Sequence, residues 1–334
     1  MKRGWERSKP LIIPDHSTVS SLLQPFLKGK EVLKLEMLSG GLSNSNVKIT
    51  LVTGECYVLR IYNGEIMKGQ VERKVLQLVE DTVPVPEVLY SDFSLSTYEY
   101  PVILLSWIHG DQLSEMFDKK EEEKLIQAAH ETGRHLAAIH TFQFSSPGFF
   151  DEELNVHPLD LSGAESFIHM LEKIITDKPF LQNSGTEMAE DISRLARNHA
   201  HLLDHTGNHT SLVHSDFNPL NILIKEATDG IQVTGILDWE FAFSHSPLID
   251  IGNMLRYEDV HQSSFIKPFI SSYLKHGGKL PQNWLQQAKL LDMVALCDLA
   301  NKENCGQVRL LDTQRLIRKT LNEWEVYAGI QAHL

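Results

Sequence analysis

The sequence predicts an α+β fold in which a small β-rich lobe is followed by a larger, mostly helical lobe. The chain has 334 residues, long enough for about two domains or lobes. Segments with strand character dominate between residues 32 and 107, whereas apolar residues at helical spacing dominate after residue 110. Hydrophobic residues make up 42% of the sequence, which is enough to fill a core in each lobe.

The first lobe is predicted to be one small sheet with a single helix. Residues 1–31 are expected to form a leading arm or helix, and residues 32–106 the β-rich lobe. Apolar and β-branched residues bounded by turns indicate strands at 32–38, 47–52, 57–62, 88–90 and 101–107. Helical spacing of apolar residues indicates a helix from about 70 to 80, and residues 107–110 are predicted to be the hinge.

The second lobe, residues 111–334, is predicted to be helical around one hairpin. Two capping-box patterns, Ser162 to Glu165 and Ser184 to Glu187, indicate helix starts, because the hydroxyl and the carboxylate satisfy each other's free backbone amides there. Helices are predicted at 121–140, 163–176, 185–204, 263–276, 281–301 and 307–327. Apolar segments at 221–225 and 231–237, joined across Asp229-Gly230, indicate a β-hairpin.

The composition argues against nucleic-acid and membrane partners. Lys and Arg total 31 against 44 Asp and Glu, which gives a formal charge of −13, and no basic stripe of the kind that binds a duplex is present. An acidic protein is compatible with a cationic small molecule instead. The apolar runs are too short for a membrane span or a signal-peptide core, and three cysteines do not indicate a disulfide framework. We therefore expect a cytoplasmic protein with a small-molecule substrate, as a monomer or a homodimer.

One stretch of the second lobe carries residues suited to phosphoryl transfer. The pattern His214-x-Asp216-x4-Asn221 is followed by the predicted hairpin and then by Asp238. Phosphoryl transfer needs a carboxylate that orients the attacking hydroxyl and accepts its proton, and hard oxygen ligands that hold Mg²⁺ against the phosphates. Asp216 suits the first task, and Asn221 and Asp238 suit the second, because the hairpin brings its two ends together. His214 is interpreted as an anchor for the loop rather than a proton carrier.

The chain resembles the aminoglycoside phosphotransferase family, a protein-kinase-like group that includes choline-kinase-like and other small-molecule kinases. The resemblance extends from about Val32 to the C-terminal helices. Besides the catalytic loop, the segments that carry it are GGLSN (40–44), YVLR (57–60), ERKVL (72–76), TGRHLAAIH (132–140) and PLID (247–250).

The resemblance implies a two-lobed protein-kinase-like fold and transfer of the γ-phosphoryl group of ATP or GTP, with Mg²⁺, to a hydroxyl of a small acceptor. It assigns nucleotide contacts to Gly40, Gly41, Ser43, Asn44, Arg60, Glu72, Ser106 and Ile108. Arg60 stands where protein kinases have a strand lysine, and a guanidinium also binds phosphate well. Glu72 would fix Arg60, Asp250 would support the catalytic-loop backbone, and Glu240 stands where many relatives have a second acid.

Segment lengths favour a small acceptor within this resemblance. Asp250 lies only twelve residues after Asp238, too near for the activation loop and peptide platform of a protein kinase. More than a hundred residues separate Gly110 from His214, where the family inserts its substrate-binding helices.

Two classes of acceptor stay open. An aminoglycoside-like or other cationic acceptor would suit the acidic composition, and carboxylates are available at Glu258, Asp259, Asp292, Asp298 and Glu303. The alternative is an amino alcohol or sugar of the choline, homoserine or methylthioribose type. A quaternary ammonium group would need an aromatic cage, for which Tyr257, Tyr273, Trp284 and Trp324 are the candidates.

Three other functions are weighed against the kinase interpretation. A pseudokinase scaffold would be expected to lack one of the three motif residues, and all are present. A zinc hydrolase is disfavoured because His130 and His135 are five residues apart and diverge on a helix, although His205 and His209 have a ligand-pair spacing. A P-loop enzyme is disfavoured because no G-x4-G-K-[ST] pattern occurs.

Overall fold

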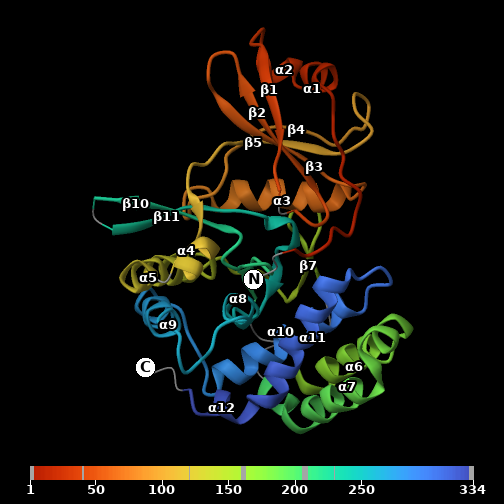
Figure 1. Ribbon diagram of the computed structural model, residues 1–334, viewed down its shortest axis with the longest axis vertical. Helices are drawn as coiled ribbons and strands as arrows, with labels where there is room; N and C mark the ends of the chain where they lie inside the picture. Colours follow the sequence, from red (N-terminus) through yellow and green to blue (C-terminus); the bar gives the residue numbers. More distant parts are fainter. Residues whose placement is uncertain are drawn as a thin grey trace.

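The computed structural model describes residues 4–39, 41–119, 121–158, 163–204, 210–228 and 230–330 (Figure 1). The β-rich part stands above the helical part in this view, and part of the red N-terminal segment lies between the two. The N-terminal sheet has five antiparallel strands in the order β1-β2-β3-β5-β4. Its strands are β1 (Val32–Met37), β2 (Ser45–Leu51), β3 (Cys56–Ile61), β4 (Val88–Asp92) and β5 (Val102–Ser106). The five predicted strands are thus confirmed.

Helices cover both faces of this sheet, and the strand sequences reflect it. On β5, Val102 and Leu104 pack toward α1 (His16–Leu22) and α2 (Gln24–Leu27), whereas Ile103 and Leu105 belong to the core that contains α3 (Ile66–Val79). Because side chains alternate between the faces of a strand, a strand covered on both sides is apolar throughout. The predicted helix near residues 70–80 is confirmed, but it begins four residues earlier.

The C-terminal part packs helices around a hairpin and a second small sheet. The predicted hairpin is confirmed as β10 (Ile222–Ala227) and β11 (Gly230–Ile236), and β10 also pairs with β6 (Asp111–Gln112). The second sheet, which the sequence did not predict, has the order β8-β7-β12-β9. Its strands are β7 (Gly148–Phe150), β8 (Val156–Pro158), β9 (Ser211–Val213) and β12 (Phe243–His245).

Most predicted helices of this part are present. They are α5 (Glu122–Ile139), α6 (Gly163–Ile175), α7 (Lys178–His199), α9 (Ile266–Lys275), α10 (Trp284–Ala300), α11 (Gln307–Asn322) and α12 (Trp324–Ala328). The short helices α4 (Leu113–Lys119) and α8 (Leu248–Met254) and the 3-10 turns at Ala200–Leu203 and Trp239–Phe241 were not predicted. Within the described residues, no helix is both long and apolar enough to cross a membrane.

The predicted helix start near residue 185 is confirmed, but a helical segment that the sequence did not predict precedes it. The helix α7 begins at Lys178, where the Asp177 side chain accepts a hydrogen bond from the Lys178 N–H. Gly185, with φ 79° and ψ 165°, is not helical and separates the two helical segments of α7. The Ser184 hydroxyl is buried without a hydrogen-bond partner among the described residues, so the predicted capping box does not form. The other capping box includes Ser162, which lies outside the described residues.

Candidate active site

The loop after β9 is held in shape by one buried carboxylate. Asp250, in the first turn of α8, accepts hydrogen bonds from the backbone N–H of His214 (2.8 Å) and of Ser215 (2.7 Å). His140, which follows α5, contacts the same carboxylate at 3.1 Å. Ser215 has φ 67°, a left-handed conformation that is unfavourable for a serine. The Asp250 carboxylate therefore stabilises a strained backbone just before Asp216.

His214 is fully buried and belongs to the same hydrogen-bond network around the loop. Its Nδ1 accepts a hydrogen bond from the Asp216 N–H (3.2 Å), so the ring proton must reside on Nε2, which donates to the Leu237 carbonyl (2.8 Å). The ring packs on Trp239 with centroids 4.5 Å apart. Both ring nitrogens are thus used in positioning the loop, which leaves neither to carry a proton in a reaction.

The Asp216 carboxylate is fixed by two side-chain amides. Asn218 donates to Oδ1 of Asp216 at 2.8 Å, and Asn221 donates to Oδ2 at 2.9 Å. Both amides also donate to the Asp216 carbonyl oxygen at 2.9 Å. Because the Asn221 amide nitrogen faces Asp216, its amide oxygen points away from that carboxylate. Sequence reasoning missed Asn218, although it lies inside the motif between Asp216 and Asn221.

The hairpin brings the two expected metal ligands together. Ile222 pairs with Ile236 across β10 and β11, and the Leu237 N–H donates to the Asn221 carbonyl at 2.8 Å. Asp238 is the next residue in the chain after Leu237, so it lies close to Asn221. An amide oxygen and a carboxylate are the hard oxygen donors that Mg²⁺ prefers, and Mg²⁺ is commonly held by one or two protein groups together with phosphate oxygens. The donor set at Asn221 and Asp238 fits that ion.

One buried guanidinium meets three carboxylates beside these residues. Arg60, on β3, contacts Glu72 of α3 at 3.0 Å and Glu240 at 3.1 Å, and it also pairs with Asp238. Burial alone would lower the pKa of Arg60, but the charges of Asp238 and Glu72 outweigh it and raise that pKa well above its usual value. The Tyr62 hydroxyl donates to Glu72. The predicted Arg60–Glu72 contact is therefore present.

The same cluster holds more negative charge than one cation can balance. Burial raises the pKa of Glu240 to about 7, with Asp238 adding to the rise and Arg60 opposing it. Burial likewise raises the pKa of Glu72. Because burial disfavours the ionised forms of Glu72 and Glu240, and the partly exposed Asp238 competes for the same guanidinium, the cluster retains a proton near neutral pH.

The small-residue turn before β2 lies next to this cluster. Asn44 is buried, and its side chain lies against Glu240 and favours the ionised carboxylate. The Ser43 hydroxyl lies 3.1 Å from the Ser8 hydroxyl, so it is engaged by the N-terminal arm. Gly41 belongs to the described part of the turn, whereas Gly40 lies outside the described residues.

The segment between the two lobes packs closely on the hairpin. Ser106 is tied to Glu87, with the Ser106 N–H donating to the Glu87 carbonyl and the Glu87 N–H donating to the Ser106 hydroxyl, both at 2.9 Å. A Cβ on Gly235 of β11 would lie 2.9 Å from the Ile108 side chain. A side chain at 235 would therefore require the Ile108 side chain to move away from the hairpin.

Residues proposed for an acceptor have different surroundings. Asp292 is buried and paired with Arg256 at 2.6 Å, so its charge is already balanced. Burial lowers the pKa of Arg256, but Asp292 and, to a lesser degree, Asp216 raise it by more. Three of the four candidate cage aromatics belong to the buried core; these are Tyr273, Trp284 and Trp324. They cannot form an exposed aromatic cage.

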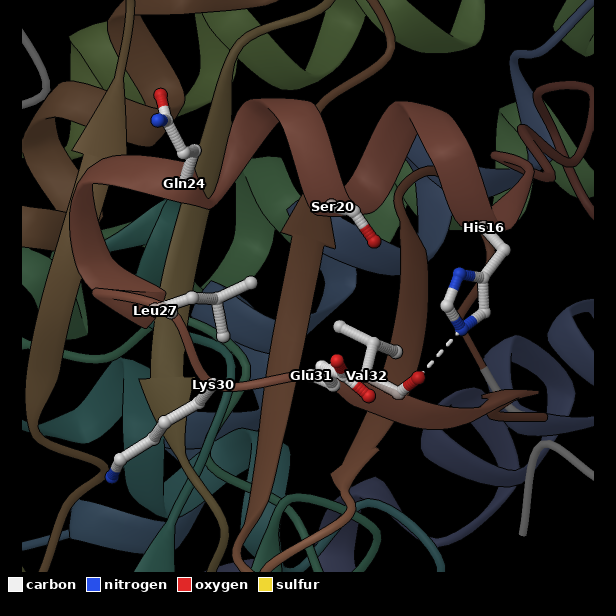
Figure 2. Close-up of a pocket in the computed structure, with 8 residues that line it drawn as sticks. His16, Ser20, Gln24, Leu27, Lys30, Glu31 and Val32 are labelled. Atoms are coloured by element: carbon white, nitrogen blue, oxygen red, sulfur yellow. Dashed lines mark hydrogen bonds between the residues drawn. The ribbon is translucent and has the colours of Figure 1, made fainter.

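A hollow of about 290 Å³ elsewhere on the N-terminal part is not the candidate site (Figure 2). It lies between the helices α1 and α2 and the start of β1, and His16 there bonds to the Val32 carbonyl at 2.8 Å. Its lining residues are His16, Ser20, Gln24, Leu27, Gly29, Lys30, Glu31 and Val32. None of them belongs to the motifs, and they do not converge on one point.

The zinc interpretation finds no site in the described residues. Within them, no three His, Cys, Asp or Glu side chains are grouped so as to hold a metal. Burial, and then the neighbouring Arg134, lower the pKa of His135 to about 4. His205 and His209 lie outside the described residues.

Comparison with known proteins identifies the family and the fold of the chain. The model of the phosphotransferase enzyme family (APH) matches residues 34–285. The crystal structure of aminoglycoside phosphotransferase APH(4)-Ia is 17% identical and aligns over 95% of this chain and 100% of that one, with a TM-score of 0.65. A putative aminoglycoside phosphotransferase from Ralstonia eutropha is 18% identical over 94% of this chain and 98% of that one, with a TM-score of 0.64.

A third structure, the GDP and kanamycin complex of APH(2'')-IIia, is 14% identical over 91% of this chain and 98% of that one, with a TM-score of 0.68. A thermostable mutant of APH(4)-Ia has also been crystallised with AMP-PNP and hygromycin B. No curated protein sequence matches the chain significantly. The predicted two-lobed, kinase-like α+β fold and the resemblance to aminoglycoside phosphotransferases are confirmed.

Proposed function

Because the chain belongs to the phosphotransferase enzyme family, we propose that it transfers the γ-phosphoryl group of ATP or GTP to a hydroxyl of a small acceptor. The fixed carboxylate of Asp216 is the observation that carries this proposal. Asn218 and Asn221 hold both of its oxygens through N–H donors, so one orientation is available for receiving an acceptor hydroxyl.

The nucleotide would lie between the two lobes. Asn221 and Asp238 would hold Mg²⁺, which neutralises charge on the transferring phosphates. The Arg60 guanidinium would exchange its contact with Asp238 for a contact with the phosphates, while Glu72 would keep the guanidinium in place. The phosphates would be covered by the backbone of Gly40, Gly41, Ser43 and Asn44. Backbone groups of Ser106 and Ile108 would bind the edge of the base, which suits ATP and GTP alike.

The acceptor would be small. The stretch from Asp238 to Asp250 contains only a 3-10 turn, β12 and the start of α8, which leaves no room for a platform that binds a peptide. The net charge of −13 favours a cationic acceptor, as in an aminoglycoside. The buried positions of Tyr273 and Trp284 argue against a quaternary ammonium group, so homoserine-like or sugar acceptors are the alternative.

We further expect the protein to be cytoplasmic. Nucleoside triphosphates and Mg²⁺ are both available there. The cysteines Cys56, Cys297 and Cys305 are all free thiols, which agrees with a reducing compartment.

The test is an acceptor screen with matched variants. Purified protein is incubated with ATP or GTP and Mg²⁺ and with a panel of aminoglycosides, choline, ethanolamine, homoserine and methylthioribose, and release of ADP or GDP is followed. At least one acceptor should raise nucleotide turnover above hydrolysis, and Asp216→Asn should abolish that increase. Asp81→Asn removes an exposed carboxylate outside the site and should leave turnover unchanged.

The screen can refute the proposal in two ways. Acceptor-dependent turnover that survives in Asp216→Asn would exclude the proposed role of this carboxylate. Tight nucleotide binding without phosphorylation of any acceptor would favour a pseudokinase scaffold over an enzyme.

A further inference from the structure

The N-terminal arm, residues 4–14, connects the two lobes at the candidate site. In Figure 1 the red segment that precedes α1 runs from the region between the lobes up to α1. Successive residues of the arm contact opposite lobes. Trp5 and Glu6 contact α11 of the helical lobe, whereas Arg7 and Ser8 contact the turn before β2.

The arm is anchored on the first turn of α11. The Glu6 carboxylate accepts hydrogen bonds from the backbone N–H of Val308 (2.9 Å) and Arg309 (3.1 Å), which have no partner within the helix. The Trp5 indole donates to Asp312 at 3.1 Å. A carboxylate at a helix N-terminus also interacts favourably with the helix dipole. The Val308 contact accordingly lowers the pKa of Glu6.

The arm binds the turn through four consecutive carbonyl oxygens. The Arg7 guanidinium donates to the carbonyls of Gly41, Ser43 (3.3 Å) and Asn44 (2.9 Å). The Ser8 N–H (2.9 Å) and hydroxyl (3.1 Å) donate to the carbonyl of Leu42, the one that Arg7 does not reach. Every carbonyl from 41 to 44 is therefore occupied by the arm.

This contact fixes where the amide N–H groups of the turn point. In a trans peptide the carbonyl of one residue and the N–H of the next point in opposite directions. When the carbonyls of residues 41–43 face the arm, the N–H groups of residues 42–44 face away from it, and Ser45 begins β2 opposite Ile61 of β3. Successive backbone N–H groups in a turn form a concave anion site. The Asn44 side chain reaches Glu240, beside Arg60 and Asp238, so the turn borders the proposed phosphate position.

We propose that Arg7 is a positioning residue for the nucleotide: it orients the backbone N–H groups of the turn toward the phosphates, and Glu6 fixes it to α11. This inference rests on the proposed function of the site. Arg7 acts through the turn and is not assigned a contact with the nucleotide. The arm thereby ties the phosphate-binding turn of one lobe to a helix of the other.

The test compares four variants of the full-length protein. Arg7→Ala removes the guanidinium. Arg7→Lys keeps the charge but loses the planar fork that reaches three carbonyls. Glu6→Gln weakens the anchor on α11. Lys9→Ala is the matched control, since it removes one positive charge from an exposed position on the same arm. Binding of ATP and GTP with Mg²⁺ is measured by calorimetry, and amide hydrogen exchange of residues 41–46 is measured without nucleotide.

Arg7→Ala should weaken nucleotide binding about tenfold, as expected when several charge-assisted hydrogen bonds are lost at a partly exposed position. Arg7→Lys should lose most of the same affinity, and Glu6→Gln less. Amides of the turn should exchange faster in Arg7→Ala while those of α10 stay protected. In the acceptor assay, KM for the nucleotide should rise with kcat little changed, a split that general destabilisation would not produce.

The outcomes separate this inference from the proposed function. If the parent protein binds nucleotide and Arg7→Ala matches Lys9→Ala in affinity and exchange, the inference is overturned and the kinase proposal stands. If Arg7→Lys binds nucleotide as tightly as the parent protein, the positive charge alone accounts for the effect of Arg7. That result would overturn the proposal that the guanidinium orients the turn. If the parent protein binds neither nucleotide, the proposed function fails and so does the role of Arg7 toward a nucleotide, even where exchange of the turn increases.

Discussion

Replacing Glu240 by glutamine should change how the stability of the protein depends on pH. Glu240 is nearly fully buried and shares the Arg60 guanidinium with Asp238 and Glu72. Burial raises its pKa from 4.5 to about 7. The glutamine side chain has the same shape but carries no charge, so Glu240→Gln removes this titration and retains the packing.

The direction and size of the effect follow from the pKa. Between about pH 4.5 and 7 the native protein holds a proton that the unfolded chain has released, so the free energy of unfolding falls as the pH rises. The difference from 4.5 to about 7 corresponds to roughly 3 kcal/mol, at about 1.4 kcal/mol per pH unit. The stabilisation is fully present below pH 4.5 and is lost above about pH 7.

Urea unfolding at pH 5, 6, 7 and 8, without Mg²⁺ or nucleotide, measures this dependence. The parent should lose roughly 3 kcal/mol across the series, and Glu240→Gln should lose much less. Glu55→Gln is the control: its pKa is about 2, so it does not titrate in this range. If the free energy of unfolding depends on pH equally in the parent and in Glu240→Gln, the claim that Glu240 holds a proton in the native protein is refuted.

Two further substitutions test how the site is held together. Asp250→Asn removes the charged acceptor of the His214 and Ser215 N–H groups, and it should lower the free energy of unfolding in urea by about 3 kcal/mol. A loss below about 1 kcal/mol would show that the loop does not depend on the Asp250 carboxylate. Gly235→Val places a side chain against Ile108, where even a Cβ would lie at 2.9 Å. It should raise KM for ATP and GTP with kcat little changed. An unchanged KM would show that the nucleotide base does not bind beside Ile108.

Patterns local in the sequence predicted most of the fold. The five strands and the hairpin were found because their apolar residues alternate between turn residues, and α5 because its apolar face is long and regular. The β7–β8 and β9–β12 pairs were missed because three-residue strands carry too little periodicity. The segment of α7 before Gly185 was missed because the capping-box pattern at Ser184 indicated only the second of the two helix starts.

The candidate site was predictable where chemistry and spacing coincide, as in Asp216, Asn221 and Asp238. Contacts between distant segments were not. The pairing of Arg60 with Asp238 and Glu240 joins residues about 180 positions apart, and the contacts of Arg7 and Glu6 link the start of the chain to both lobes. Such contacts leave no periodic or spacing signal in one sequence, since they depend on how the lobes pack.

Magnesium-dependent nucleotide binding tests the central claim most directly. Binding of ADP and GDP is measured by calorimetry with and without Mg²⁺ for the parent, Asp238→Asn and Asp216→Asn. The parent and Asp216→Asn should both bind more tightly with Mg²⁺, and Asp238→Asn should lose that gain. Mg²⁺ enhancement that persists undiminished in Asp238→Asn would contradict the assignment of this carboxylate to the metal.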